Sequence, residues 1–365
     1  MTISPEEFNG ERLQIAREFR GLTQKDLASL ITASHVLVSY YESGKRKNPS
    51  SELVDAFGTV LGFRQEFFYG HDLSLNEWQC NFRHRRTSTE RIKSKVRAHA
   101  WIVGLITKHL RKEMTLPEFA VPHIPVQTDS DIDIAAERCR MAWSLGVDAP
   151  IDNISRTLER AGVMIAADVV ETRKVDAFSG YGPVSLIFVN RSIDSSSRFH
   201  FDVAHETGHM VMHRGVETGS HETEQAADRF ASSFLMPRVA FTREFLQDSF
   251  SWTHIWSIKQ RWKVSGAAIV RRAYDLRLIG ADTYRKAQKY LSFKGYRSQG
   301  EPYEPELQEP ELLPNALRYL AERDPESLRE MANTIGLTGS TFKEVISFDL
   351  PPDPRVAQFP SKKQG

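Results

Sequence analysis

The sequence is poor in the features that mark secreted, disulfide-bonded and membrane-spanning proteins. It contains two cysteines in 365 residues, Cys80 and Cys139, which lie far apart and form no Cys-x-x-Cys motif. A disulfide framework and a cysteine-based metal site are therefore not expected. No apolar run approaches the roughly 18 residues of a membrane-spanning helix, and the first residues lack the basic and apolar regions of a signal peptide. We expect a cytoplasmic protein with no membrane partner.

The chain also lacks a strong overall charge and the composition of a disordered protein. Its formal net charge is +1, with 40% hydrophobic and 26% charged residues, as in ordinary globular proteins. Its length favours two or three domains. One stretch departs from this balance, because residues 83–112 carry many lysines and arginines against a single acidic residue, Glu90. This stretch either meets phosphates or forms a solvated helix face that contacts an acidic surface elsewhere.

The most informative motif is H-E-T-G-H at residues 205–209. On a helix, His205 and His209 lie on one face, one turn apart, so both imidazoles can reach the same metal ion. Glu206 can then touch a water molecule at that ion. Residues 182–190 read as a short apolar strand, and the serines at 195–197 offer caps for a following helix. The motif predicts a hydrolytic site, and the alternative is a surface helix that carries two histidines by chance.

A third protein ligand is needed if a tetrahedral zinc ion keeps one position open for water, and a carboxylate on an adjacent helix commonly supplies it. Residues 224–237 read as a second helix that stops at its proline. An antiparallel helix pair would bring Glu224 back toward the motif. Glu222 and His221 remain rivals, because the sequence does not define the helix phase. A further alternative is that Glu224 only stabilises the helix N-terminus.

Three other residues are candidates for contacts with a substrate. His213 lies one turn beyond His209 and would stabilise a developing oxyanion or orient a ligand. The alternative is that His213 only closes the last helical turn, near its negative dipole end. Ser179 and Gly180 are expected on a strand edge that pairs with an extended peptide, a mode in which backbone groups do the binding.

These residues carry a family resemblance. The motif at 205–209, followed by the run from Glu224 to Pro237, resembles the ImmA/IrrE family of metallo-endopeptidases. That resemblance implies that His205, His209 and Glu224 bind Zn²⁺ and that Glu206 is the catalytic base, which takes a proton from water and gives it to the leaving amine. The likeness covers roughly residues 130–310 and includes Asp176-Ala-Phe-Ser-Gly180, Arg198-Phe199, Trp262-Lys-Val-Ser265, Gly295-Tyr-Arg297 and Glu301-Pro302.

The N-terminal part of the chain reads as a bundle of short helices. Thr23 begins one of them with Asp26 as an acidic third residue, and Gly21 breaks the chain just before it. Two helices joined by a tight turn predict a helix-turn-helix, whose second helix normally enters the DNA major groove. The expected helices cover residues 8–20, 23–31, 34–42 and 51–61.

The runs at residues 21–28 and 39–45 resemble the Cro/C1-type (XRE-like) repressor fold over about the first 65 residues. Two positions depart from that pattern, because Val36 and Leu37 stand where polar base-reading residues are usual. Their side chains can touch thymine methyl groups but make no hydrogen bonds to base edges. The alternative to specific DNA recognition is a bundle that is structural or forms a homodimer. The DNA contacts that the resemblance implies come from Gln24, Ser34, His35, Ser39 and Lys45.

The predicted fold class is α+β and mainly α, with a zincin-like metallopeptidase domain of a small sheet plus helices. We predict a helix-turn-helix domain at 1–75, a basic helical linker at 76–128, the peptidase domain at 129–300, and an arm with a helical tail at 301–365. The arm, Glu301 to Pro310, is acidic and proline-rich, so we expect it to run extended, with the option of covering the metal site.

Together the two resemblances predict a DNA-associated regulatory zinc endopeptidase. Its substrate would be a partner regulator, either a repressor or an antitoxin-like protein. The competing hypothesis is a transcription regulator that uses the zinc domain as a sensor or protein-interaction module without turnover. A third is a scaffold that uses both modules only for contacts, which an absence of bound zinc would favour.

Overall fold

The computed structural model describes residues 7–70, 79–82, 90–168, 177–181, 184–190 and 195–347. The chain divides into two compact units, residues 1–72 with 314–365, and residues 73–313. We call them the terminal unit and the central unit. The four-part division expected from the sequence stays a prediction. The first basic residues of the stretch at 83–112, the residue at 176 and the last part of the expected helical tail, residues 348–365, lie outside the described residues.

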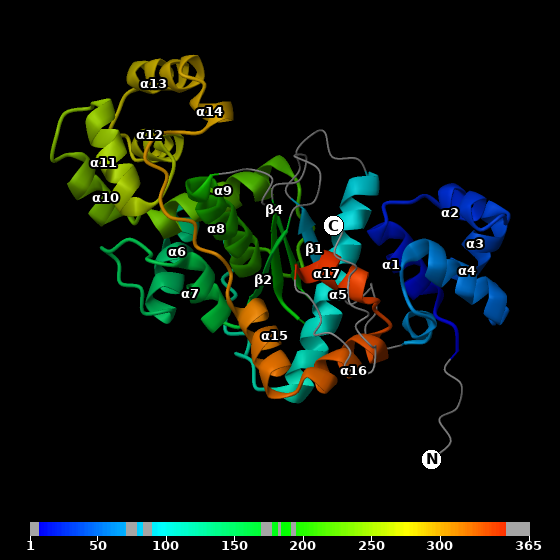
Figure 1. Ribbon diagram of the computed structural model, residues 1–365. Coiled ribbons are helices and arrows are strands. Elements are labelled where there is room, and N and C mark those ends of the chain that lie inside the picture. The colour runs from blue at the N-terminus through cyan, green and yellow to red at the C-terminus, as the bar shows by residue number, and fades with distance from the viewer. Residues whose placement is uncertain are drawn as a thin grey trace, which may run out of the picture. The chain divides into compact units, whose positions relative to one another are not determined.

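The terminal unit begins with helices that are capped by polar side chains. Asn9, Thr23, Ser34 and Ser50 each accept a hydrogen bond from a backbone N–H in the first turn of the helix that follows, which satisfies a donor with no partner inside the helix. Thr23 also forms a capping box with Asp26, the acidic third residue noted in the sequence. The elements, blue in Figure 1, are α1 (Gly10–Phe19), α2 (Gln24–Leu30), α3 (His35–Glu42), α4 (Ser51–Leu61) and the 3₁₀ helix η1 (Gln65–Tyr69).

Three C-terminal helices complete the terminal unit, an association that the sequence pattern did not reveal. Leu337 pairs with Phe63, and the Arg64 N–H donates to the Gly336 carbonyl at 2.9 Å. Gly336 has a φ of 82°, and a Cβ there would lie 2.1 Å from the backbone nitrogen of Phe67, so only glycine permits this approach. The helices are α15 (Leu312–Arg323), α16 (Pro325–Ile335) and α17 (Gly339–Ile346).

A four-stranded sheet lies at the heart of the central unit, in the order β1-β3-β4-β2. The strand β3 pairs antiparallel with both β1 and β4, whereas β2 pairs parallel with β4. The expected apolar strand at 182–190 corresponds to β4. Their bounds are β1 (Gln79–Phe82), β2 (Met164–Asp168), β3 (Ala177–Tyr181) and β4 (Leu186–Asn190).

Two long helices cover the sheet. Ile187 belongs to the same buried core as Val203 of α8 (Ser196–Met212), whereas the ring of the next residue, Phe188, packs against His99 of α5 (Glu90–Glu113) at 5.2 Å. Because successive residues of a strand point to opposite faces, α8 and α5 cover opposite faces of the sheet. Figure 1 shows both helices beside the green strands.

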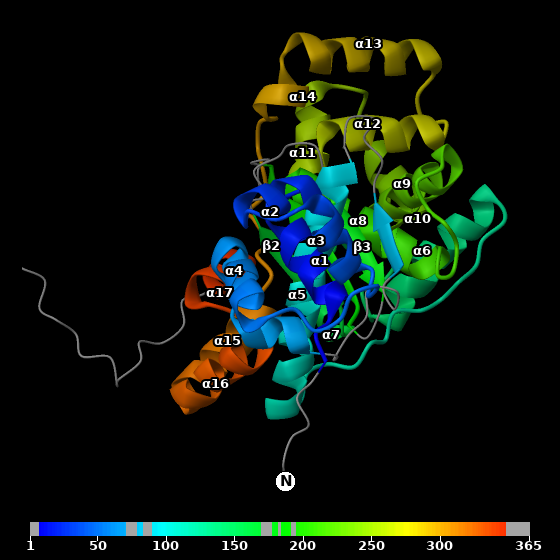
Figure 2. The same cartoon turned by 90° about the vertical axis from the view of Figure 1, so that its right-hand side faces the viewer.

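The remaining helices of the central unit make the domain mainly helical, so the expected α+β class is confirmed. Arg140, fully buried, donates to the Phe234 carbonyl at 2.6 Å and thereby joins two of these helices. None of the described helices is long and apolar enough to cross a membrane. The elements, which Figures 1 and 2 show in two views, are α6 (Asp129–Ala142), α7 (Ile154–Arg160), α9 (His221–Leu235), α10 (Arg238–Phe245), α11 (Trp252–Trp262), α12 (Gly266–Asp275), α13 (Ala281–Phe293) and α14 (Tyr296–Gln299).

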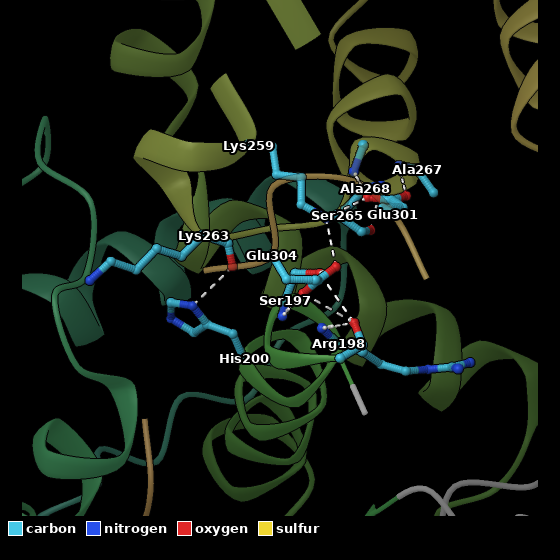
Figure 3. A network of polar contacts seen from close by, with 12 residues as sticks. Ser197, Arg198, His200, Lys259, Lys263, Ser265, Ala267, Ala268, Glu301 and Glu304 are labelled. Atoms are coloured by element: carbon cyan, nitrogen blue, oxygen red, sulfur yellow. Dashed lines mark hydrogen bonds and ion pairs between the residues drawn. The ribbon is translucent and has the colours of Figure 1, made fainter. Parts of the chain in front are cut away.

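The acidic arm has no regular structure at residues 301–311 and is tied to the starts of two helices (Figure 3). Glu304 accepts a hydrogen bond from the Ser197 N–H at 2.9 Å, in the first turn of α8, and Glu301 accepts one from the Gly266 N–H at 2.6 Å, at the start of α12. The fully buried Lys259 ammonium lies 2.7 Å from Glu304 and 2.9 Å from Glu301. Carboxylates at helix N-termini are favourable, and the lysine offsets their charge.

These contacts place the arm at the far end of α8 from the H-E-T-G-H motif. His205 follows Ser197 by eight residues in the sequence, which corresponds to about 12 Å along a helix. The expectation that the arm covers the metal site gains no support from these contacts. The arm instead holds the start of the helix that carries the motif.

Candidate metal centre

The motif helix α8 is buried along most of its length, polar residues included. Ser195 caps it, accepting a hydrogen bond from the Arg198 N–H at 3.3 Å. His205, Glu206, Thr207 and His209 all have 0% exposure. Buried polar groups destabilise a fold unless they have partners, so a row of them inside a core indicates a site with a dedicated function.

Two histidines and one glutamate converge at the centre of this row. The Nε2 atoms of His205 and His209 lie 3.1 Å apart. The carboxylate of Glu224, in the first turn of α9, lies 3.5 Å from Nε2 of His205 and 3.4 Å from Nε2 of His209. Of the three candidates for the third ligand, Glu224 alone joins the histidines, because His221 and Glu222 are exposed.

The trio fits a single zinc ion. Zinc binds imidazole nitrogen and carboxylate oxygen at about 2.0 to 2.2 Å, and a tetrahedral arrangement then separates two ligand atoms by about 3.3 Å. The observed separations lie close to that value: 3.1 Å between the two Nε2 atoms, 3.4 Å from Nε2 of His209 to Oε1 of Glu224, and 3.5 Å from Nε2 of His205 to Oε2 of Glu224. A set of two histidines and one carboxylate is also the ligand chemistry of hydrolytic zinc sites, which keep a fourth position open.

Each histidine has a second partner on the side away from the trio. Nδ1 of His205 lies 2.8 Å from Asp228 Oδ1, and Nδ1 of His209 lies 2.9 Å from Nδ1 of His213. A histidine that presents Nε2 to a metal keeps its proton on Nδ1, so His205 would donate to Asp228 and His209 to His213. These partners hold the two rings in the orientation that a metal requires.

Asp228 is a site residue that the sequence analysis missed. It lies four residues after Glu224, so the two side chains share one face of α9. That spacing was a usable signal, because a carboxylate one turn from a candidate ligand is well placed to bind the back of a ligand histidine. His213 ends α8, as the structural alternative expected, and also makes the contact of a residue that orients a ligand.

The burial of the site shifts the pKa values of its acidic and basic groups. Burial raises the pKa of Glu206, while His209, His205 and the hydroxyl of Ser179 oppose that rise. Burial also raises the pKa of Glu224, but the contacts with His205 and His209 outweigh it and bring the pKa to about 2. Glu206 is thereby the better proton acceptor of the two, whereas Glu224 stays ionised as a ligand must.

Burial and the neighbouring His209 lower the pKa of His213 to about 4. Its ring is therefore neutral near pH 7, with one nitrogen that lacks a proton. A neutral ring accepts the hydrogen bond from Nδ1 of His209, which a protonated ring cannot do. The pKa shift and the 2.9 Å contact thus describe the same arrangement.

Helices α8 and α9 approach closely at Gly208, the fourth residue of the motif. A Cβ built on Gly208 would lie 3.0 Å from Cδ1 of Phe230, which is itself fully buried. A larger residue would therefore push α9 away from α8. Because α9 carries Glu224, the glycine sets the distance between the third ligand and the two histidines.

The expectation that Ser179 and Gly180 lie on a strand edge is wrong. Both belong to β3, an interior strand whose sides are occupied by β1 and β4. The strand β1 places its Asn81 opposite Ser179 and its Cys80 opposite Gly180. Backbone pairing with a peptide is blocked there while β1 is in place. The side chain of Ser179 nevertheless faces the site, because its hydroxyl acts on Glu206.

The residues expected to contact DNA are divided between interior contacts and the surface. Gln24 donates to Glu42 at 2.8 Å and so links α2 to α3, and Ser34 caps α3. Ser39 is half-buried, whereas His35 and Lys45 are exposed. Contacts with DNA by these five residues stay predictions.

Comparison with models of known families finds two matches. Residues 158–274 match the peptidase family model of the IrrE N-terminal-like domain, and residues 10–66 match a helix-turn-helix domain. The first match contains α8, α9 and the three residues His205, His209 and Glu224, and the second contains α1 to α4. No curated protein matches the chain. The two resemblances noted in the sequence are confirmed: an IrrE-type domain follows a helix-turn-helix domain.

Proposed function

We propose that this chain, which joins an IrrE-type domain to a helix-turn-helix domain, is a DNA-associated zinc endopeptidase that cuts a partner regulator. A repressor or an antitoxin-like protein is the class of substrate that this combination favours. The observation that carries the proposal is the convergence of two buried histidines, His205 and His209, with the half-buried Glu224 beside the buried Glu206. A site used only for structure needs no buried carboxylate of raised pKa next to its ligands.

The residues divide the chemistry among themselves. Zn²⁺ held by His205, His209 and Glu224 would polarise the scissile carbonyl and make water more acidic. Glu206 accepts the proton of the attacking water and gives it to the leaving amine. Burial raises the pKa of Glu206, which makes its carboxylate a stronger base for the first step. Asp228 and His213 keep the two imidazole rings oriented.

The helix-turn-helix domain supports a role beside DNA. A peptidase that is delivered to DNA meets proteins bound there at a high local concentration, so a DNA-bound regulator is the substrate that benefits from this arrangement. The surface that would contact DNA is exposed at His35 and Lys45.

A sensor or protein-interaction module without turnover is the second candidate function. The observation that favours it is the pairing of β1 along β3, which leaves no open strand edge beside Ser179 among the described strands. The two candidates differ in what they require of the site. Regulation that survives Glu206→Gln but fails in His205→Ala would indicate metal-dependent binding, whereas regulation lost in both would indicate hydrolysis.

The experiment that tests the proposal compares new protein N-termini in native-host cells that express the wild type or Glu206→Gln. Zinc content is measured in both proteins, because the variant should keep the metal. A new N-terminus that appears with the wild type and not with the variant would identify the substrate and the cut site. If both strains give the same N-termini under basal and stress conditions, the endopeptidase proposal is wrong.

A further inference from the structure

The recognition helix α3 has an apolar outer face. Val36 and Tyr40 are 43% and 44% exposed, and they share one face because they lie four residues apart. Leu37, between them, is half-buried. The opposite face packs into the terminal unit through Val38 and Tyr41, at 0% and 3% exposure. The outer side chains are therefore not needed for the core of the unit.

Basic residues lie at the edge of this apolar face. Lys45 and Arg46 follow α3 and are exposed, as is Lys25 of α2, whereas the exposed Lys47 pairs with Glu7 at 3.3 Å. The Lys45 ammonium lies over the Tyr40 ring at 5.8 Å, and the Arg46 N–H donates to the Tyr40 carbonyl at 3.0 Å. The loop after α3 thus folds back and brings its positive charges to the edge of the apolar face.

The acidic side chains of α2, α3 and the loop after α3 make hydrogen bonds or ion pairs inside the terminal unit. Residues 24–47 contain two of them, Asp26 and Glu42. Asp26 belongs to the capping box of α2, and the carboxylate of Glu42 binds Arg17 at 2.6 Å and Gln24 at 2.8 Å. The outer surface therefore presents an apolar centre with a basic border, which complements a polyanion with apolar groups at its middle.

We propose that α3 recognises double-stranded DNA mainly through the methyl groups of thymine, with Val36 and Leu37 as the specificity-determining residues. This inference rests on the DNA association in the proposed function, and it adds that the preferred DNA contains thymines at the bases that α3 contacts. In the major groove thymine is the base that offers a methyl group, and it is distinguished there by apolar contact. Val36 and Leu37 occupy the first turn of α3, the part of a recognition helix that reaches base edges.

The other outer residues have different tasks. His35 supplies an imidazole beside Val36 and can hydrogen-bond a base edge. Lys45 and Arg46 contact phosphates, which positions the helix without selecting a sequence. Specificity by methyl contact is weaker for each base than a bidentate hydrogen bond, so the preferred sites contain several thymines within reach of the helix.

The test begins with the full-length protein and a pool of DNA duplexes that have a random central segment. Duplexes that bind are enriched over several rounds, and the dominant one is then synthesised with thymine or with deoxyuridine at each thymine position in turn. Uracil lacks the methyl group and keeps every hydrogen-bonding atom of thymine. The Kd of each duplex is measured for the wild type, Val36→Ala, Leu37→Ala and Lys45→Ala.

We expect deoxyuridine to weaken wild-type binding by about 4-fold at each contacted thymine, the loss that corresponds to one apolar carbon removed from a contact. In Val36→Ala or Leu37→Ala, one such position should become insensitive to the exchange. Val36 is exposed and lies outside the core of the unit, so its truncation should leave the unit folded. Lys45→Ala is the matched control, which should weaken both duplexes equally and lower the dependence on salt.

Equal Kd values for the thymine and deoxyuridine duplexes at every position would overturn the methyl inference while leaving DNA association intact. Failure of the protein to bind any duplex would overturn the inference and the DNA association together, and would indicate a protein partner or a second copy for this face. Neither result bears on hydrolysis, which the Glu206→Gln comparison tests separately.

Discussion

The metal centre and the outer face of α3 both present histidines, but their surroundings differ completely. His205 and His209 have 0% exposure, and each ring has a partner at both nitrogens. His35 is exposed on α3. At the metal centre the function can be inferred from the surrounding residues, because the distances between their nitrogen and oxygen atoms can be compared with the ligand spacing that a zinc ion requires. On α3 the function of an exposed side chain depends on the molecule that it contacts.

The largest expected effect is at Glu206. Glu206→Gln keeps the size of the side chain and removes its basicity, so we expect turnover of a peptide substrate to fall by about three orders of magnitude or more with zinc retained. Hydrolysis and zinc content are measured on the same preparation. Retained hydrolysis would show that the buried carboxylate is not the base.

The choice of Glu224 over its neighbour can be tested by a matched pair. Glu224→Gln removes the charge of the proposed third ligand, whose carboxylate lies 3.4 to 3.5 Å from both histidines, whereas Glu222→Gln changes an exposed side chain two residues earlier. We expect zinc affinity to fall by at least about 100-fold in the first variant and to stay unchanged in the second. Competition with a zinc-binding dye measures both, and equal affinities would remove Glu224 from the ligand set.

Asp228 should have a smaller effect, because it acts through His205. Asp228→Ala leaves the ligand atoms in place but frees the His205 ring, and loss of such a partner typically lowers metal affinity by about 10- to 100-fold. Asp228→Asn, which can still accept a hydrogen bond, should recover part of the loss. A variant with wild-type affinity would mean that the core alone orients the ring.

Gly208→Ala tests whether close packing of α8 on α9 positions Glu224. Overpacking a buried contact destabilises a protein by about 1 to 3 kcal/mol, and here the displaced helix carries a ligand. We expect both the free energy of unfolding and the zinc affinity to fall. Gly280→Ala is the control, since a Cβ at that position meets nothing within 4 Å. Unchanged zinc affinity in Gly208→Ala would show that the close packing of α8 on α9 does not determine the position of Glu224.

The smallest expected effect is at the start of helix α3. Ser34 caps α3, so Ser34→Ala should destabilise the terminal unit by about 1 kcal/mol, measured by chemical denaturation. If DNA affinity falls no further than this loss of folded protein explains, Ser34 is a cap. A much larger loss of affinity would support the DNA contact that the family resemblance implies.

The parts of the site that could be predicted from the sequence are those set by spacing along one helix. His205 and His209 share a face because of their i, i+4 spacing, whatever the rest of the fold does. Glu224 required the phase of a second helix, so three candidates stayed open until the contacts across α8 and α9 were known. Asp228 shares that helix and could have been proposed from its spacing alone.

The parts that the sequence pattern did not reveal depend on partners far away in the chain. Ser179 and Gly180 form a strand, but their interior position is decided by β1, which pairs with them from a remote segment. The return of the C-terminal helices to the terminal unit depends on contacts such as that of Gly336 with Phe67. No local sequence pattern near β3 or near Gly336 indicates the remote segment with which it pairs, because periodicity reports only which face of an element is buried.

The zinc content of the intact protein, measured by native mass spectrometry in the wild type, Glu206→Gln and His205→Ala, tests the proposed metal centre most directly. We predict one zinc ion per chain in the first two proteins and none in the third. Zinc retained by His205→Ala, or no zinc in a folded wild type, would contradict it.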